Sequence, residues 1–114
     1  EMGHLLGLRH NFAGSSQRTL AQLSDPVVAN RIGITASVMD YTPFNLMAIG
    51  RKGVPFFTPT LGEYDHWAIQ YGYTPVPGAR TPEEERPVLA QIARRSGAPG
   101  HAYQRDEAAD GFDP

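Results

Sequence analysis

The sequence contains no cysteine, so disulfides and thiolate ligands are excluded and any metal must be held by histidine and carboxylate. It also lacks a basic field. Its 10 Lys and Arg are scattered among 12 Asp and Glu, and the formal net charge of -2 excludes nucleic acid as an expected partner. No apolar run approaches the roughly 20 residues that span a bilayer. At 114 residues the chain has the length of one small domain.

Glycine and proline are plentiful, with 12 and 10 copies, which predicts short helices separated by loops. Cap signals place the helix starts. A Ser24-Asp25-Pro26 start opens a short helix, Thr60 with Glu63 opens another, and Thr81-Pro82 opens a third. We therefore predict a mainly α chain with the following segments: a first helix within 1–10 that reaches about Leu8, a short helix from 26 to about 30, helices at 60–73 and 81–96, and an irregular tail at 97–114.

The first ten residues contain the spacing E-x-x-H-x-x-G-x-x-H, formed by Glu1, His4, Gly7 and His10. Only a leading histidine separates it from the long zinc-protease signature H-E-x-x-H-x-x-G-x-x-H. A histidine directly before Glu1 would lie one helical turn from His4 and would point at the same ion. We therefore expect a sequence truncated at both ends that begins inside the motif.

The spacing of these residues predicts a zinc site of the hydrolytic type. Glu1 lies one residue off the face of His4, where a carboxylate can act as general base toward an activated water without binding the metal. Gly7 can adopt a left-handed conformation, end the helix and let His10 return to the ion. Three imidazoles would leave the fourth position of a Zn²⁺ ion open, as a catalytic site requires. The alternative is that His4 and His10 are ordinary helix and loop histidines.

A second motif, Ser37-Val38-Met39-Asp40-Tyr41, follows the histidines, and the two together resemble the metzincin clan of zinc endopeptidases. In that clan the methionine of this turn, the Met-turn, forms an apolar floor under the imidazoles, which implies such a role for Met39. Tyr41 matches the tyrosine that in astacin-like and serralysin-like members ligates zinc or hydrogen-bonds the oxyanion, which makes it a candidate catalytic residue. The alternative readings are a core methionine and a packed aromatic.

A finer resemblance is to the Met-zincin (EcxA-type) zinc-binding domain of large bacterial zinc-dependent metalloproteases. It rests on three blocks, Leu8–Phe12, Ser37–Tyr41 and Gly62–Tyr73, and is loose from Thr74 onward. The resemblance implies the C-terminal half of a metzincin-type catalytic domain. It also implies an exported protein, periplasmic or extracellular, that acts on protein or peptide substrates.

Other polar residues have less specific readings. Asp40, and less so Asp65, could hydrogen-bond and orient a metal-bound imidazole, but a turn or helix-surface carboxylate is the favoured reading for both. Asn11 could fix the loop after His10 through bonds to the backbone. His66 and His101 read as surface histidines.

The function expected from these residues is a zinc-dependent endopeptidase with Zn²⁺ as cofactor, although residues 1–114 alone are expected to be inactive. Two alternatives stay open. One is an inactive zincin-like binding module, and the other is a structural zinc-binding domain, which would need four protein ligands.

Overall fold

A computed structural model describes residues 1–109, and within that range the chain forms helices and loops without a strand. The expected mainly α class is confirmed. The elements, where η marks a 3-10 helix, are α1 (Met2–Leu5), η1 (Gly14–Gln17), α2 (Leu20–Ser24), α3 (Pro26–Ile32), η2 (Leu46–Ala48), α4 (Glu63–Tyr73), α5 (Pro82–Ala93), η3 (Arg94–Gly97) and α6 (Asp106–Ala109). Over this described range no helix is long and apolar enough to cross a membrane.

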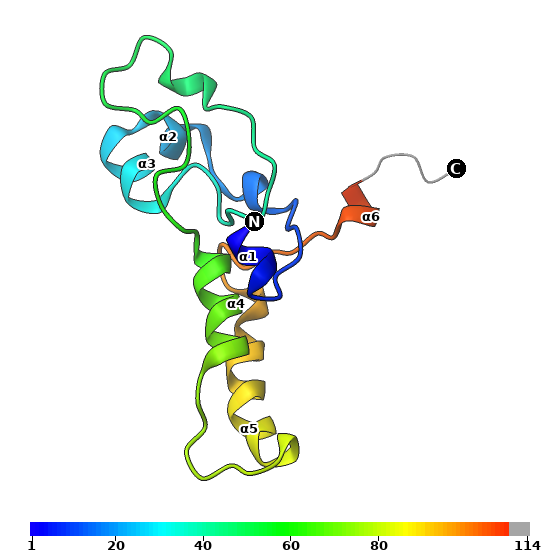
Figure 1. Cartoon of the computed structure of the whole chain (residues 1–114). Coiled ribbons are helices and arrows are strands. Elements are labelled where there is room, and N and C mark those ends of the chain that lie inside the picture. Colours follow the sequence, from blue (N-terminus) through cyan, green and yellow to red (C-terminus); the bar gives the residue numbers. More distant parts are fainter. Residues whose placement is uncertain (110–114) are drawn as a thin grey trace.

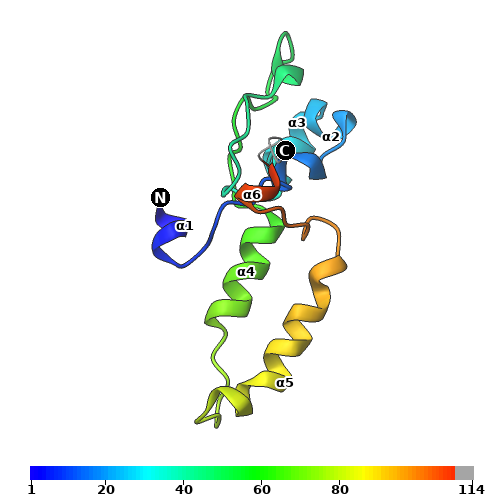
Figure 2. The ribbon, with the colours of Figure 1, turned by 90° about the vertical axis from the view of Figure 1, so that its right-hand side faces the viewer.

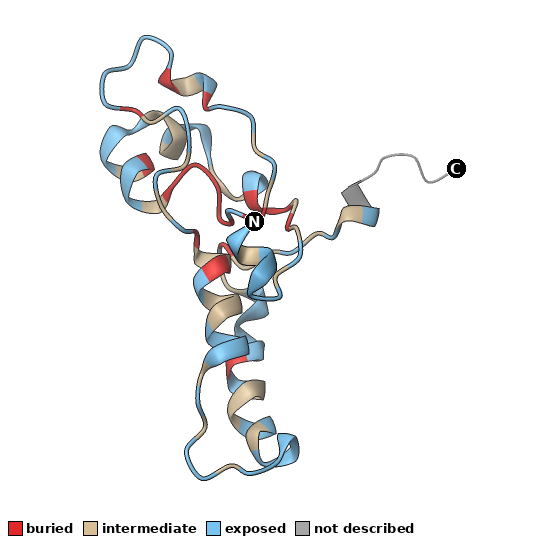
Figure 3. Ribbon diagram, in the orientation of Figure 1, coloured by how far each residue is buried: buried red, intermediate tan, exposed pale blue. Residues whose placement is uncertain are grey.

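The molecule is elongated, with extents of 55 × 41 × 25 Å. At one end α4 and α5 pack as a helical hairpin, and at the other α2 contacts α3 and η2 (Figures 1 and 2). Buried residues concentrate in the segment 33–39, between these two ends (Figure 3). The radius of gyration is 16.4 Å, against roughly 13 Å for a globular domain of this length. Side chains of α1 are correspondingly exposed, with Met2 at 77% and Leu5 at 87%.

Two helices begin where their cap residues predict. The Asp25 carboxylate accepts hydrogen bonds from the backbone N–H of Val27 at 2.8 Å and of Val28 at 3.0 Å. The Thr81 hydroxyl accepts from the Glu84 N–H at 3.4 Å. A proline follows each cap and occupies the first helical position, where its missing N–H costs nothing.

The first helix is shorter than expected, because α1 ends at Leu5 instead of near Leu8. Gly7 has a φ of 87°, and the N–H groups of Gly7 and Leu8 bond back to the carbonyls of His4 and Gly3 at 3.0 Å each. This is a Schellman closure, which consumes the last carbonyls of the helix and turns the chain away. The predicted left-handed turn at Gly7 is therefore confirmed.

Two other boundaries also differ from expectation. Helix α4 begins at Glu63 with Gly62 as its N-cap, so the predicted capping role of Thr60 was wrong. The stretch expected as an irregular tail at 97–114 contains α6, and residues 110–114 of it lie outside the described range. At each of these places a carboxylate contacts a distant segment: Asp65 of α4 bonds to Val38, and Asp106 of α6 bonds to His10.

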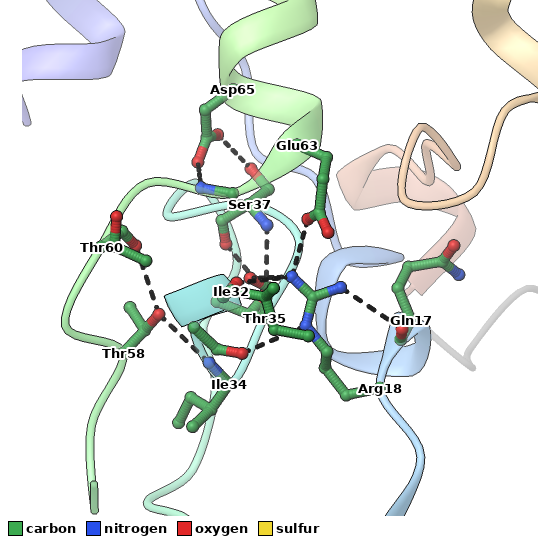
Figure 4. Close-up of polar contacts among 12 residues, drawn as sticks. Gln17, Arg18, Ile32, Ile34, Thr35, Ser37, Thr58, Thr60, Glu63 and Asp65 are labelled. Carbon is green, nitrogen blue, oxygen red and sulfur yellow. Dashed lines mark hydrogen bonds and ion pairs between the residues drawn. The ribbon is translucent and has the colours of Figure 1, made fainter. Parts of the chain in front are cut away.

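Arg18 connects the elements around the buried segment (Figure 4). Its guanidinium donates to the carbonyl oxygens of Ile32 at 2.7 Å, Gly33 at 3.1 Å and Thr35 at 3.2 Å. It also pairs with the Glu63 carboxylate at 2.6 Å, and its side chain is only 3% exposed. One cation thus satisfies the carbonyls at the end of α3 and ties them to the first turn of α4.

We predict that Arg18→Ala destabilises the fold by about 3 kcal/mol, since three carbonyls and a carboxylate lose their shared donor. Denaturation followed by circular dichroism measures the effect. Arg86→Ala, at an exposed position on α5, is the matched control and should stay within about 0.5 kcal/mol of the parent. Equal stabilities for the two variants would contradict this assignment.

Candidate metal centre

The two histidines of the opening motif lie side by side. His4 comes from α1, His10 comes from the loop beyond the Gly7 turn, and their Nε2 atoms are 3.2 Å apart. The ring centroids are separated by 4.7 Å with an interplanar angle of 79°. The turn at Gly7 thus brings His10 back toward His4, as the spacing predicts.

Each imidazole uses its other nitrogen to hold its orientation. His4 Nδ1 lies 2.9 Å from the carbonyl oxygen of Leu8, and His10 Nδ1 lies 3.2 Å from Asp106 Oδ2. A carbonyl and an ionised carboxylate only accept, so both Nδ1 atoms must carry the proton. When both imidazoles are neutral, both Nε2 lone pairs point into the same space, where a metal ion or a shared proton can lie between them.

The separation of these nitrogens suits zinc. Two Zn–N bonds of about 2.0–2.1 Å at a tetrahedral angle place the nitrogens about 3.3 Å apart. The described chain brings two such donors together and contains no cluster of three or more His, Asp or Glu able to hold a metal ion. The residues present therefore fit two of the protein ligands of a zinc site.

A small cavity of about 120 Å³ opens beside the histidines, and Glu1, Met39, Asp40 and Tyr41 are among its lining residues. The Glu1 side chain is exposed at the start of α1. The Tyr41 ring lies 4.8 Å from the His10 ring, centroid to centroid, and is 73% exposed. A carboxylate, a phenol and two imidazoles thus line one cavity.

Met39 is buried against the active-site helix, with 5% of its surface exposed. A Cβ built on Gly3 would overlap its sulfur, so glycine at this position lets α1 approach the turn while Met39 keeps its present conformation. The Met39 carbonyl also accepts the Asn11 N–H at 2.9 Å. Met39 therefore contacts the segments before and after the two histidines.

The Met-turn is held by Asp65, the third residue of α4 (Figure 4). Its Oδ1 accepts the Ser37 hydroxyl at 2.7 Å, and its Oδ2 accepts the backbone N–H groups of Val38 and Gly62, each at 2.9 Å. Asp65 is 3% exposed. The favoured reading of Asp65 as a helix-surface carboxylate was wrong, because two donors from the turn and the backbone N–H of Gly62 stabilise its buried oxygens.

The carboxylate at the His10 ring belongs to Asp106, which the sequence did not single out. Asp40, the residue preferred for such a contact, instead accepts the Ser15 N–H through Oδ2 at 2.7 Å. No local signal marks Asp106, because it lies 96 positions from His10 along the chain. In the structure Asp106 begins the short helix α6, in a stretch that the sequence predicted to be irregular.

Next to this contact, Arg9 pairs with Glu107 at 3.3 Å. The hydrogen bond and charge of Glu107 raise the pKa of Arg9. The pKa of Glu107 is lowered, first by a bond from its own backbone N–H and then by Arg9. Both side chains are exposed, so the ion pair contributes little to the stability of the fold.

Asn11 holds the loop that follows His10. Asn11 is fully buried, donates to the Ala102 carbonyl at 2.9 Å and accepts from the Ala13 and Gln104 N–H groups at 3.2 and 3.0 Å. The predicted loop-fixing role of Asn11 is confirmed.

Of the remaining histidines, His66 is exposed, as predicted. His101 is instead half-buried, stacked on Trp67 with ring centroids 4.7 Å apart, and its Nδ1 lies 2.7 Å from the Arg95 carbonyl. The surface assignment of His101 was wrong because its partner lies on α4, far away in sequence.

The paired histidines share a cavity with the buried Met39. A family model of Met-zincin proteins matches residues 1–114, and the chain belongs to the Met-zincin family. Membership implies a metalloprotease-like domain and zinc binding in general. The comparison with curated proteins finds no match, and neither does the comparison with solved structures.

We predict that Gly3→Ala destabilises the chain by about 1 kcal/mol or more, because the added methyl group displaces Met39. The matched control is Gly72→Ala in α4, where an added Cβ meets open space and should stabilise by up to about 1 kcal/mol. Thermal unfolding measures both, and the Met39 methyl resonance should shift only in Gly3→Ala. A stabilised Gly3→Ala variant would remove this contact from the account.

Proposed function

We propose that this chain contributes the zinc-binding floor of an endopeptidase that hydrolyses peptide bonds. The single observation that carries the proposal is the 3.2 Å approach of two Nε2 atoms whose Nδ1 protons are engaged by Leu8 and Asp106. In this proposal His4 and His10 hold the ion. A histidine directly before Glu1 is proposed as the third ligand, since a residue four positions before His4 shares its helix face.

Zinc, when bound, supplies a Lewis acid that polarises the scissile carbonyl and lowers the pKa of water to about 7. Glu1 takes the proton of the attacking water and passes it to the leaving amine. Its exposed position at the cavity beside both histidines gives it access to that space. Tyr41 is proposed to donate its phenol proton in a hydrogen bond to the developing oxyanion.

In this scheme Met39 does not bind the metal and instead excludes water from the site. Buried under α1 and bonded through its carbonyl to Asn11, it keeps water from the lower side of the histidines and limits their tilt. Asp40 lines the same cavity, but its bond to Ser15 supports a role in shaping the turn. The proposed substrate is therefore a polypeptide whose scissile bond enters the side of the cavity lined by Glu1 and Tyr41.

The ligand set predicts how zinc affinity depends on the residue before Glu1. Residues 1–114 alone should bind zinc weakly and show no peptidase activity, because they bring two imidazoles together. A linker ending in Ser-His and attached directly before Glu1 should raise the affinity for zinc at least about 100-fold over a linker ending in Ser-Ala. The estimate follows from the binding free energy of roughly 10–16 kcal/mol for zinc sites with four ligands. Isothermal titration with Zn²⁺ measures the difference.

Two substitutions calibrate that titration. His10→Ala should abolish the gain from the added histidine, whereas His66→Ala, at an exposed histidine of α4, should leave it intact. Tight stoichiometric uptake by residues 1–114 without the extension would instead favour a closed structural site. Equal affinities for the two linkers would exclude a histidine ligand at that position.

In the full-length protein, Glu1→Gln should lower kcat by about 10²–10⁴-fold while the zinc content is unchanged, since the amide cannot accept the proton. Peptide hydrolysis together with metal analysis measures both quantities. Glu83→Gln, at an exposed glutamate of α5, is the matched control and should retain the parental rate. Near-normal turnover in Glu1→Gln would remove Glu1 from the mechanism. A parent that binds zinc yet cleaves no peptide would favour the binding-module alternative.

A further inference from the structure

Residues 102–107, here called the C-terminal strap, lie against the loop that carries His10. The Phe12 N–H donates to the Gln104 carbonyl at 2.9 Å. The Gln104 N–H donates to the Asn11 side chain at 3.0 Å, and that side chain donates to the Ala102 carbonyl at 2.9 Å. Because Asn11 is fully buried, these bonds are shielded from water and fix the register between strap and loop.

The register continues into the charged side chains. Arg9 meets Glu107 at 3.3 Å, and His10 meets Asp106 at 3.2 Å. The two segments therefore run in opposite directions, with Arg9, His10 and Phe12 facing Glu107, Asp106 and Gln104 in turn. The backbone bonds of Gln104 place Asp106 at the His10 ring, and the exposed Arg9–Glu107 pair lies one position further along the strap.

The two oxygens of Asp106 differ in their surroundings. Oδ2 accepts from His10 Nδ1, whereas Oδ1 is shielded from solvent and has no hydrogen-bond partner within residues 1–109. Within residues 1–109, His10 Nδ1 is the donor that contacts this carboxylate. A carboxylate that accepts from an imidazole Nδ1 favours a proton on that nitrogen and increases the electron density at Nε2.

We propose that Asp106 is a positioning residue that holds His10 in the Nδ1–H tautomer, with Nε2 free for a divalent metal. The metal part of this inference rests on the proposed function. The tautomer part does not, because it concerns the metal-free chain. The C-terminal strap is then a component of the metal centre, although it lies far from the motif in the sequence.

The test uses the full-length protein at pH 8.5 with Zn²⁺ alone as the probe metal. Nitrogen-15 shifts of the His10 ring in the metal-free protein report the tautomer, and a competition titration reports zinc affinity. Asp106→Ala should move His10 toward the Nε2–H tautomer and weaken zinc binding 10–100-fold. Asp106→Asn should keep the tautomer, because its carbonyl oxygen still accepts, and should lose less affinity.

Glu107→Ala is the matched control, since it removes the neighbouring carboxylate of the strap without touching His10. It should leave the tautomer unchanged and the zinc affinity within about threefold, below the 10–100-fold loss of an orienting partner. Hydrogen exchange of the Phe12 amide, which bonds to Gln104, reports whether the strap stays attached in each variant. If Asp106→Ala detaches the strap, the His10 tautomer and the zinc affinity of Asp106→Asn are compared with those of Glu107→Ala, and that comparison tests the proposal.

An unchanged tautomer in Asp106→Ala with the strap attached would overturn the proposal, as would a loss in Glu107→Ala equal to that in Asp106→Ala. In the case of a detached strap, an Nε2–H tautomer in Asp106→Asn overturns it as well. A parent protein that takes up no zinc would overturn the proposed function instead. The ring shifts would still decide whether Asp106 sets the tautomer.

Discussion

The buried carboxylate of Asp65 is the interaction on which the site depends. It joins the first turn of α4 to the Met-turn through one hydroxyl and two backbone N–H donors. Met39, at the centre of that turn, packs against Gly3 before the first histidine and bonds to Asn11 after the second. Both imidazoles therefore take their positions from a turn that one helix-borne carboxylate holds. Arg18 supports the same junction from the other side, because its carbonyl partners and Glu63 flank it.

The centre itself combines three segments, the motif loop at 1–12, the Met-turn at 37–41 and the C-terminal strap at 102–107. Each fixes a different degree of freedom. Leu8 and Asp106 each contact one imidazole Nδ1, Met39 packs where α1 approaches the turn, and Gly7 sets the direction of the loop. The two Nε2 atoms are thereby held 3.2 Å apart.

The local part of the fold was predictable from sequence. The side chains of Asp25 and Thr81 accept hydrogen bonds from backbone N–H groups two or three residues later, and Gly7 ends α1 through bonds to residues three to five positions away. Prediction failed where a distant partner decides the outcome. Helix α4 begins at Glu63 instead of Thr60 because Asp65 binds the N–H of Gly62 as well as the Met-turn. His101 is stacked on Trp67 instead of exposed, and that contact crosses from the strap region to α4.

By itself the sequence determined the chemistry of the centre. Residue types at fixed short spacings place His4, His10 and Glu1 around one cavity, because helix period and a glycine turn act over a few residues. Met39 and Tyr41 lie in that cavity too, where the family pattern of the Met-turn predicts them. Only the tertiary structure decided which carboxylates support it. Asp65 and Asp106 rather than Asp40 contact the turn and the ring. Contacts across tens of residues depend on how the helices pack, and no local spacing encodes them.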